Sequence, residues 1–236
     1  MASTRASPGA SPRRRPRVWL AAALAAVALL AGCSGAGTLN ALSGRTGYNL
    51  QADVPYGELD RQKLDIYTPT TAAPAGGWPL VVFFYGGTWN SGERVDYRFV
   101  GAALAAQGVL TLVADYRLYP QVRYPDFVAD SAKAVAYGLD QAKRLGANPL
   151  RVFVMGHSAG GYNAAMLALD ARWLQAQGHR PQELAGWIGL AGPYDLFPTE
   201  NPDVQPVFFH PNYPPGSQPI AYAPADAPPT FVGAAV

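Results

Sequence analysis

The sequence predicts an α/β fold, with a mostly parallel sheet that carries helices on both faces. Apolar runs of strand length alternate along the chain with longer segments of helical pattern, which is typical of βαβ units. The most apolar of these runs are continuous, as in strands that are buried on both faces of a parallel sheet. At 236 residues, the chain is long enough for one such domain with a large core.

The first 32 residues have the pattern of a signal peptide. Four arginines between positions 13 and 17 precede an apolar run at 18–30, which is shorter than the roughly 20 residues that span a bilayer. The run ends in Leu30-Ala31-Gly32-Cys33, which resembles the lipobox of bacterial lipoproteins. The resemblance implies cleavage before Cys33, acylation of Cys33, and a membrane-attached, lipid-anchored protein of the bacterial cell envelope that faces outside the cytoplasm. An ordinary secretion signal followed by an incidental cysteine is the alternative.

The charge of the protein changes when the predicted signal peptide is removed. Residues 1–32 hold five arginines and no acidic residue, so 13 basic and 16 acidic residues remain. This balance gives no support to nucleic-acid binding. Residues 33–47 are rich in small side chains and are expected to form a flexible tether, which leaves 48–236 as the folded domain.

Strands and helices can be assigned in order along this domain. Residues 62–67 alternate polar and apolar side chains, which predicts a half-exposed strand. The remaining segments are assigned by continuous apolar runs for strands, and by length and terminal glycines for helices. These are strands at 80–85, 109–114, 151–155 and 186–191, and helices at 99–107, 126–145 and 159–174.

The segment 193–228 is dense in proline. Eleven of the 22 prolines lie between Pro193 and Pro229, so we expect an irregular cap or loop rather than regular structure. Residues 229–233 then predict one more strand, and the sequence ends at Val236.

A strand–turn–helix motif marks a candidate nucleophile. Gly156-His157-Ser158-Ala159-Gly160 has the Gly-x-Ser-x-Gly pattern, placed between the predicted strand at 151–155 and the predicted helix at 159–174. The sharp turn crowds the neighbours of Ser158, and glycines at 156 and 160 relieve the crowding because they have no Cβ atom. An ordinary serine in a small-residue turn is the alternative.

A second glycine-rich turn predicts an oxyanion hole. Gly86 and Gly87 follow the predicted strand at 80–85, and their backbone can approach a substrate closely. Their N–H groups, with the N–H of Ala159 at the start of the next helix, are expected to stabilise an oxyanion. Trp89 and the cap are expected to border the substrate pocket, and core packing is the alternative for such aromatic residues. A simple turn at 86–87 is the alternative.

Three segments together resemble one group of enzymes. Gly86-Gly87-Thr88-Trp89, Asp115-Tyr116-Arg117-Leu118-Tyr119-Pro120 and residues 156–161 are similar to motifs of the hormone-sensitive-lipase and kynurenine-formamidase-like esterases, in the α/β-hydrolase superfamily. The resemblance covers residues 56–233. It implies the α/β-hydrolase fold, a serine nucleophile at Ser158, a small-molecule ester substrate, and no metal or cofactor. Tyr85 stands where the group has a histidine, which leaves the backbone donors unaffected.

The acid and the base of a catalytic triad are not evident. The resemblance implies an acid after the seventh strand and a histidine after the eighth, so we expect a domain that lacks its last strand and helix, with both residues beyond position 236. His157 adjoins Ser158 on a sharp turn, where adjacent residues rarely face each other. His179 and His210 are in predicted loops. Asp195 follows the strand at 186–191 and could serve as an alternative acid, although a turn role is the simpler interpretation.

The sequence thus predicts a serine hydrolase that cleaves carboxylic esters through an acyl-enzyme on Ser158. A peptidase or amidase of the same fold is the first alternative, because such enzymes share the turn around the serine. The second alternative is a catalytically inactive hydrolase domain that serves only as an anchored binding module.

Overall fold

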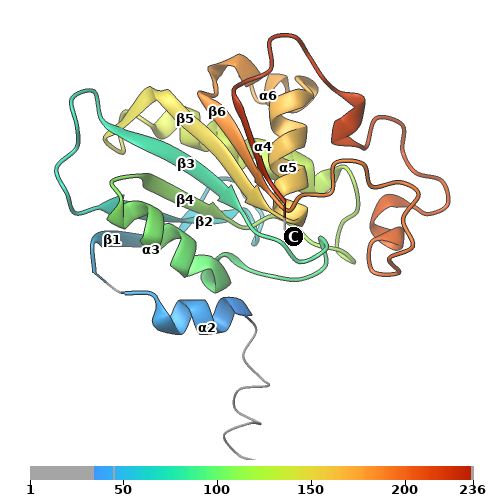
Figure 1. Ribbon diagram of the computed structural model, residues 1–236, viewed down its shortest axis with the longest axis horizontal. Helices are drawn as coiled ribbons and strands as arrows, with labels where there is room; N and C mark the ends of the chain where they lie inside the picture. The colour runs from blue at the N-terminus through green and yellow to red at the C-terminus, as the bar shows by residue number, and fades with distance from the viewer. Residues whose placement is uncertain (1–34, 45, 235–236) are drawn as a thin grey trace, which may run out of the picture.

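A seven-stranded sheet forms the centre of the molecule (Figure 1). The computed structural model describes residues 35–44 and 46–234, so the predicted signal peptide and Cys33 lie outside the described residues. The strand order is β1-β2-β4-β3-β5-β6-β7. The strands are β1 (Tyr48–Pro55), β2 (Lys63–Pro69), β3 (Trp78–Phe84), β4 (Leu110–Ala114), β5 (Ala147–His157), β6 (Gly186–Leu190) and β7 (Thr230–Gly233).

The sheet is mostly parallel, which confirms the predicted class. β3 pairs in parallel with β4 and β5, β5 with β6, and β6 with β7. β1 and β2 run antiparallel to each other, and β2 is also antiparallel to β4. The sequence does not predict β1, because most of its side chains are exposed and mix polar with apolar residues.

Helices lie on both faces of the sheet. One face carries α4 (Asp126–Gln141) and α5 (Ala159–Leu169), with the short α6 (Arg172–Gln175) against α4. The opposite face carries α3 (Arg98–Ala106), with α2 (Gly35–Leu42) beside it. Glycines allow close contact on each face: a Cβ atom on Gly138 of α4 would lie 2.8 Å from Val82, and one on Gly101 of α3 would lie 2.5 Å from Tyr67.

Some boundaries differ from the predicted ones. α4 ends at Gln141 rather than at 145, and β5 begins at Ala147 rather than at 151. The helix predicted at 159–174 is divided into α5 and α6. Between them Asp170 has an extended backbone, and its carboxylate accepts a hydrogen bond from the Arg172 guanidinium at 2.9 Å.

A short helix lies within the segment that the sequence predicts to be a tether. Asn40 joins this helix, α2, to the domain: its side-chain amide donates to the carbonyl of Val95 at 2.8 Å, and its side-chain oxygen accepts the N–H of Phe99 at 2.9 Å. Residues 35–42 are therefore helical and in contact with the domain. No helix in the described part of the chain, α2 included, is long and apolar enough to cross a membrane.

The proline-rich segment 193–228 is irregular apart from two 3-10 helices, η3 (Gln205–Phe208) and η4 (Pro219–Ala221). Two more 3-10 helices, η1 (Arg94–Tyr97) and η2 (Pro181–Glu183), lie elsewhere in the chain. Phe208 is fully buried, and the Tyr162 hydroxyl of α5 donates to the carbonyl of Ser217 at 2.6 Å. These contacts fix the cap to α5.

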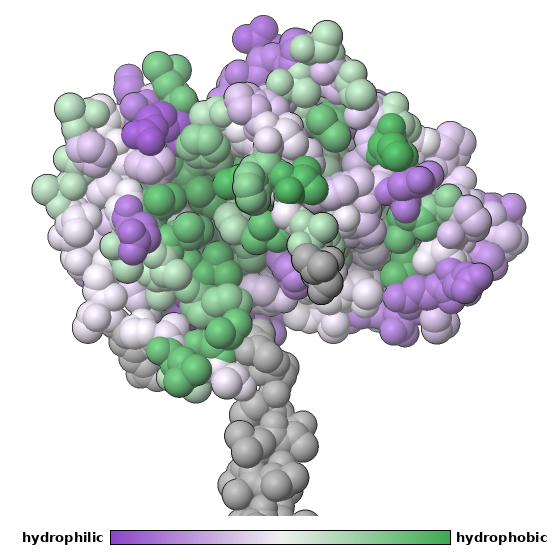
Figure 2. Space-filling view, in the orientation of Figure 1, coloured by the Kyte–Doolittle hydropathy of each residue, from purple (hydrophilic) through white to green (hydrophobic). Residues whose placement is uncertain are grey.

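The sheet face that carries α3 is covered only in part. In the view of Figure 2, apolar side chains gather on the surface beside this helix. A cavity of about 280 Å³ lies on this face, and Phe231 of β7 is 61% exposed. The cavity is lined by Leu39, Phe83, Tyr97, Phe99, Val100, Met155, His157 and Leu190.

Candidate active site

Ser158 lies at the sharp turn between β5 and α5. Its backbone has φ 53° and ψ −119°, a conformation that non-glycine residues rarely adopt and that is often found at functional sites. The turn is held on both sides: the N–H of Ser158 donates to the carbonyl of Leu190 at 2.8 Å, and its carbonyl accepts the N–H of Tyr162 at 3.1 Å. The predicted strand–turn–helix geometry is therefore present, with the serine half-buried.

The two framing glycines have the steric role that the sequence predicts. A Cβ atom on Gly156 would lie 2.0 Å from the carbonyl oxygen of Gly160, and one on Gly160 would lie 2.1 Å from the carbonyl oxygen of Phe84. Both distances are far below van der Waals contact. Only glycine at these positions lets the first turn of α5 lie directly against the ends of β5 and β3.

The loop at 86–92, here called the oxyanion loop, passes beside the nucleophile. A Cβ atom on Gly86 would lie 2.9 Å from the Cβ of Ser158. Gly87, Thr88 and Trp89 all have positive φ angles, of 124°, 48° and 58°. This left-handed turn bends the loop back toward α5, which places its backbone next to Ser158.

The orientation of one peptide in this loop follows from its hydrogen bonds. The carbonyl of Gly87 accepts the N–H groups of Asn90 at 3.0 Å and Ser91 at 3.1 Å. In a trans peptide the C=O and the following N–H point in opposite directions. The N–H of Thr88 therefore points away from the turn.

A cavity of about 210 Å³ opens next to Ser158. It brings together Ser158 and Ala159 with Thr88, while Gly86 and Gly87 are not among its lining residues. The sequence did not predict Thr88; its place directly after two glycines is the signal that could have found it. The lining residues are Thr88, Trp89, Ser158, Ala159, Ala191, Pro193, Leu196, Thr199, Asn201 and Val204.

Trp89 borders this cavity and is also part of the core. Only 1% of its surface is exposed, and its indole N–H donates to Asn163 of α5 at 3.0 Å. Asn163 in turn donates to the hydroxyl of Ser131 of α4 at 3.2 Å. The ring packs edge-on against Tyr162 and against Phe208 of the cap. The indole therefore locks the oxyanion loop, two helices and the cap together.

No histidine is placed to act as a base for Ser158 in the described residues. His157 lines the cavity on the α3 face, and burial lowers the pKa of its imidazole. His179 is 3.0 Å from Glu183 and 3.3 Å from Asp140, and His210 is 2.8 Å from the Tyr213 hydroxyl. In the part of the chain that the structure describes, the Ser158 hydroxyl has no hydrogen-bond partner.

Asp195, the alternative acid, is exposed and forms no ion pair with a described residue. Among residues 35–44 and 46–234, no group of three or more His, Cys, Asp or Glu side chains could hold a metal ion. The polar side chains in the lining of the cavity are those of Thr88, Ser158, Thr199 and Asn201, together with the buried indole N–H of Trp89.

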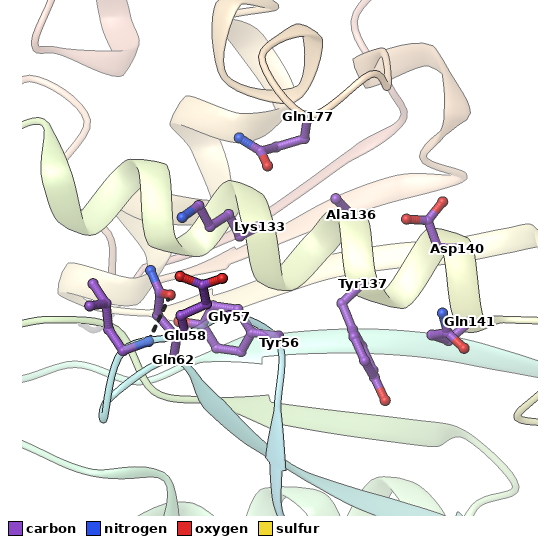
Figure 3. A pocket seen from close by; sticks show the side chains of 11 residues that line it. Tyr56, Gly57, Glu58, Gln62, Lys133, Ala136, Tyr137, Asp140, Gln141 and Gln177 are labelled. Atoms are coloured by element: carbon purple, nitrogen blue, oxygen red, sulfur yellow. Dashed lines mark hydrogen bonds between the residues drawn. The ribbon is translucent and has the colours of Figure 1, made fainter.

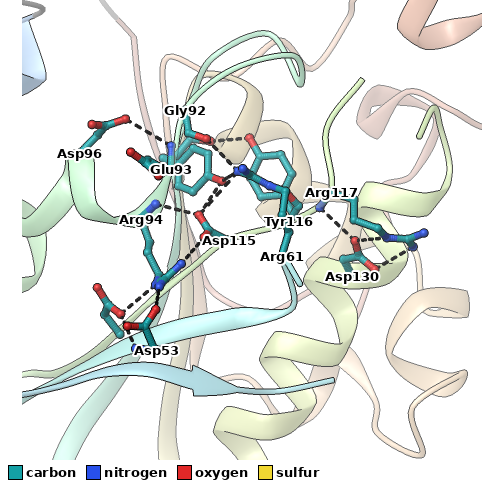
Figure 4. A network of polar contacts seen from close by, with 12 residues as sticks. Asp53, Arg61, Gly92, Glu93, Arg94, Asp96, Asp115, Tyr116, Arg117 and Asp130 are labelled. Carbon is teal, nitrogen blue, oxygen red and sulfur yellow. Dashed lines mark hydrogen bonds and ion pairs between the residues drawn. The ribbon is translucent and has the colours of Figure 1, made fainter. Parts of the chain in front are cut away.

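A network of charged side chains lies beneath the oxyanion loop (Figure 4). Asp115, at the end of β4, accepts the backbone N–H of Arg94 at 2.7 Å and forms an ion pair with its guanidinium. Arg94 also binds Asp65 at 2.8 Å, and it contacts Asp53. The segment that follows the loop is thereby fixed to β2 and β4.

Tyr85, which occupies the histidine position of the resembled group, belongs to this network. Its hydroxyl donates to Asp115 Oδ1 at 2.8 Å and accepts a hydrogen bond from Arg61 at 2.7 Å. The side chain is fully buried, and burial raises the pKa of its phenol. Tyr85 therefore supports the loop as a neutral group.

A larger cavity, of about 710 Å³, lies elsewhere on the molecule (Figure 3). It lies between the connection of β1 to β2, near Glu58, and the side of α4 that carries Lys133, Tyr137 and Asp140. It shares no lining residue with the cavity at Ser158. The smaller cavity is therefore the candidate active site.

The sequence matches the BD-FAE family over residues 64–233, which is most of the chain. The chain belongs to the BD-FAE family. An isoprenylcysteine alpha-carbonyl methylesterase of Arabidopsis thaliana is 29% identical over 63% of this BD-FAE chain and 35% of its own length. A kynurenine formamidase of Danio rerio is 30% identical over 62% of the chain and 47% of its own length. The chain thus spans between about a third and a half of the length of these curated relatives.

Solved structures show the same fold. A truncated carbohydrate esterase from gut microbiota superposes with a TM-score of 0.64 at 17% identity, covering 80% of the BD-FAE chain and 78% of its own. Esterase 2 of Thermogutta terrifontis has a TM-score of 0.63 at 24% identity, covering 80% and 71%. These neighbours confirm the α/β-hydrolase fold. The curated relatives thus include a methylesterase and a formamidase.

Proposed function

We propose that the BD-FAE chain carries the nucleophile and oxyanion hole of a serine carboxylic ester hydrolase. The observation that supports this most directly is the strained turn at Ser158, which places the hydroxyl beside the oxyanion loop and at the mouth of a cavity. A strained backbone at a serine costs folding free energy, of the order of 1–3 kcal/mol, and is typical of a functional constraint. The esterases among the relatives agree with this reaction.

In the proposed reaction, Ser158 Oγ attacks the ester carbonyl carbon, and its proton passes to a base. The carbonyl oxygen becomes an oxyanion that accepts hydrogen bonds from backbone N–H groups. When the tetrahedral intermediate collapses, the ester C–O bond breaks and the alcohol leaves with that proton. Water then attacks the acyl-enzyme by the same route and releases the carboxylic acid and free Ser158.

The proposed oxyanion donors are the N–H groups of Gly87, Thr88 and Ala159. Thr88 and Ala159 line the cavity with Ser158, and Gly87 directly precedes Thr88 in the loop. Gly86 remains a prediction of the sequence as a donor. Its small size lets the loop approach Ser158, since a Cβ atom on Gly86 would lie 2.9 Å from the Cβ of Ser158.

The cavity limits the substrate. At about 210 Å³ it is smaller than the roughly 300–1,000 Å³ of pockets that enclose drug-sized ligands. Leu196 and Val204 of the cap form apolar walls. These features support an ester with a short or medium acyl chain as the substrate.

No described histidine contacts Ser158, so the described residues show no base for the proposed reaction. We therefore test the nucleophile separately from the base. The full chain is treated with a fluorescent fluorophosphonate, and with p-nitrophenyl acetate with and without imidazole as a replacement base. We expect labelling at Ser158, and imidazole-dependent release of nitrophenol at least 10-fold above that of Ser158→Ala.

Ser43→Ala is the matched control, because Ser43 follows α2 and its hydroxyl contacts only the carbonyl of Asn40. It should be labelled like the parent chain. A folded parent that is not labelled, or a Ser158→Ala variant that is labelled equally, would contradict the proposed nucleophile. The first result would also favour the inactive binding module.

An amidase is the second candidate function, and the similarity to kynurenine formamidase favours it. The two activities share the nucleophile and differ in the leaving group. A butyrate ester and an N-formyl or aminoacyl amide of the same aromatic group distinguish them. Faster turnover of the ester supports the esterase, and faster turnover of the amide supports the amidase.

We also propose that the protein is lipid-anchored through Cys33 in the bacterial cell envelope. The support is the sequence Leu30-Ala31-Gly32-Cys33 after a basic and then an apolar segment. Expression of the full chain in a bacterium with labelled palmitate should label the protein and place it in the membrane fraction. Cys33→Ala should lose the label, and equal labelling of this variant would exclude the anchor.

A further inference from the structure

The side chain of Gln218 joins two distant parts of the cap. Its amide oxygen accepts the backbone N–H of Leu196 at 2.5 Å and the backbone N–H of Phe197 at 2.7 Å. Because both partners are donors, the amide must present its oxygen and not its NH₂ group. Two successive N–H groups can reach one acceptor only where the chain is turned, and such a turn forms a small cradle. Gln218 occupies this cradle.

A backbone hydrogen bond supports the same connection. The N–H of Ile220 donates to the carbonyl of Tyr194 at 3.0 Å. Gln218 has an extended backbone just before η4, and its own carbonyl accepts the N–H of Ala221 at 3.1 Å. The segment 194–197 is therefore joined to the segment 217–220 by one side chain and one backbone contact.

The segment 217–220 is in turn fixed to the helix that follows the nucleophile. The Tyr162 hydroxyl donates to the carbonyl of Ser217 at 2.6 Å, and Ser217 is buried. The N–H of Tyr162 donates to the carbonyl of Ser158 at 3.1 Å, near the start of α5. A series of contacts thus connects Ser158 through Tyr162 to Ser217, and Gln218 extends it to Leu196.

Leu196 is the residue of this series that would meet the substrate. It lines the cavity at Ser158, whereas Gln218 does not. The distance of an apolar wall from the nucleophile decides how long an acyl chain fits, and one methylene in such a pocket changes kcat/KM about 10-fold or more. The position of the Leu196 wall depends on the acceptor that its N–H finds at position 218.

We propose that Gln218 is a positioning residue for acyl-chain specificity. It acts through the backbone of Leu196 and holds this wall near Ser158, so that short acyl chains fit better than longer ones. A side chain that contributes to specificity from outside the cavity must be held by its own contacts, as Gln218 is. This inference rests on the proposed esterase function.

The test removes the acceptor and keeps the size of the side chain. In the full chain, Gln218→Met lacks the amide oxygen, whereas Gln218→Glu keeps acceptor oxygens. Gln182→Met is the matched control, because the exposed Gln182 amide donates to Asp226 at 2.8 Å and neither residue lines the cavity. Cleavage of p-nitrophenyl butyrate and p-nitrophenyl hexanoate is compared, with imidazole as the base.

We expect the ratio of kcat/KM for the butyrate to kcat/KM for the hexanoate to fall about 10-fold in Gln218→Met. The ratio should stay within about threefold of the parent in Gln218→Glu and in Gln182→Met. An unchanged ratio in Gln218→Met, or an equal fall in Gln218→Glu, overturns the specificity role while Ser158 can still be the nucleophile. Equal losses for both esters also overturn it, because a general loss of structure does not discriminate between chain lengths.

The aromatic packing of Phe197 should keep the cap folded in these variants. Its ring stacks on Tyr213 with a centroid distance of 4.2 Å and an interplanar angle of 18°. It also packs edge-on against Phe208 at 5.0 Å. Neither contact involves Gln218, so we expect Gln218→Met to unfold as cooperatively as the parent chain.

A second measurement does not depend on activity. The amide hydrogen exchange of Leu196 and Phe197, followed by NMR in the full chain, should be about 10-fold faster in Gln218→Met than in the parent. It should be unchanged in Gln218→Glu and Gln182→Met. If the parent chain never acylates Ser158, the proposed function fails, and this measurement still decides whether Gln218 holds the segment 194–197. Unchanged exchange in Gln218→Met would overturn that connection itself.

Discussion

The two faces of the sheet differ sharply in how well they are covered. On the face beneath α4 and α5, one row of paired residues crosses the strands as Leu112, Val82, Val154 and Trp187, with exposed fractions of 0%, 0%, 0% and 4%. The adjacent row points to the α3 face. It begins with Phe83 at 1% exposure.

This second row becomes steadily more exposed toward the edge of the sheet. Met155 and Ile188 are half-buried, and Phe231 on β7 is 61% exposed. The strands that both rows cross, β3, β5 and β6, therefore contribute to a dry core on one side and to a partly solvated apolar surface on the other. Since α5 packs on the dry side, the geometry at Ser158 depends on the covered face.

The largest loss of stability should come from a substitution of the glycine at which α5 contacts β3. Gly160→Ala would place a Cβ atom 2.1 Å from the Phe84 carbonyl oxygen, and backbone cannot move aside as a flexible side chain can. We expect unfolding free energy to fall by about 3 kcal/mol or more, measured by urea denaturation, with loss of fluorophosphonate labelling.

Gly178→Ala is the matched control for this substitution. Nothing lies within 4 Å of its added Cβ, and its φ of 81° leaves only the left-handed backbone cost of about 1 kcal/mol. Equal destabilisation by the two variants would show that the close approach of α5 to β3 does not limit stability.

Substitutions of two adjacent residues on β5 should lower the unfolding free energy by different, smaller amounts. Val154 faces α4 and α5 and is fully buried, whereas Met155 faces the other side and is half-buried. We expect Val154→Ala to cost about 2 kcal/mol and Met155→Ala less than about 1 kcal/mol, although methionine is the larger side chain. Denaturation midpoints at equal m-values measure both. A greater loss at Met155 would mean that the α3 face is covered in solution.

The fold could be predicted wherever burial leaves a continuous apolar pattern. β3, β4 and β6 are apolar on both sides of the strand because they are central in a parallel sheet. β1 could not be predicted, since only Val54 is buried along its length. The helix α2 could not be predicted either, because the side chain that joins it to the domain by hydrogen bonds is a single polar residue, Asn40, in a segment of small residues.

The site could be predicted where the backbone itself demands a residue type. The turn at Ser158 can be predicted from the sequence because it excludes a Cβ atom at positions 156 and 160, which must therefore be glycine. Thr88 is different. The direction of its N–H depends on which groups bind the Gly87 carbonyl. That arrangement requires no particular residue types at a fixed spacing, so the sequence does not predict it.

The smallest effect should be a pH dependence at His157, whose side chain lies on the partly covered face. Burial lowers the pKa of this imidazole, because the surroundings of Phe83, Met155 and Leu190 disfavour its charged form. The unfolded chain, with a pKa near 6.5, then binds protons more readily than the folded chain. The stability contribution of neutral His157 is therefore fully present above about pH 6.5 and is lost as the pH falls through the folded pKa.

NMR titration of the His157 ring should give a midpoint below 6.5. Leu190→Ala opens the apolar surroundings to water, so the midpoint should move back up toward 6.5 and the loss of stability at low pH should shrink. His157→Gln, which cannot titrate, should remove that part of the pH dependence altogether. A midpoint that does not respond to Leu190→Ala would mean that the partly covered face does not set the protonation of His157.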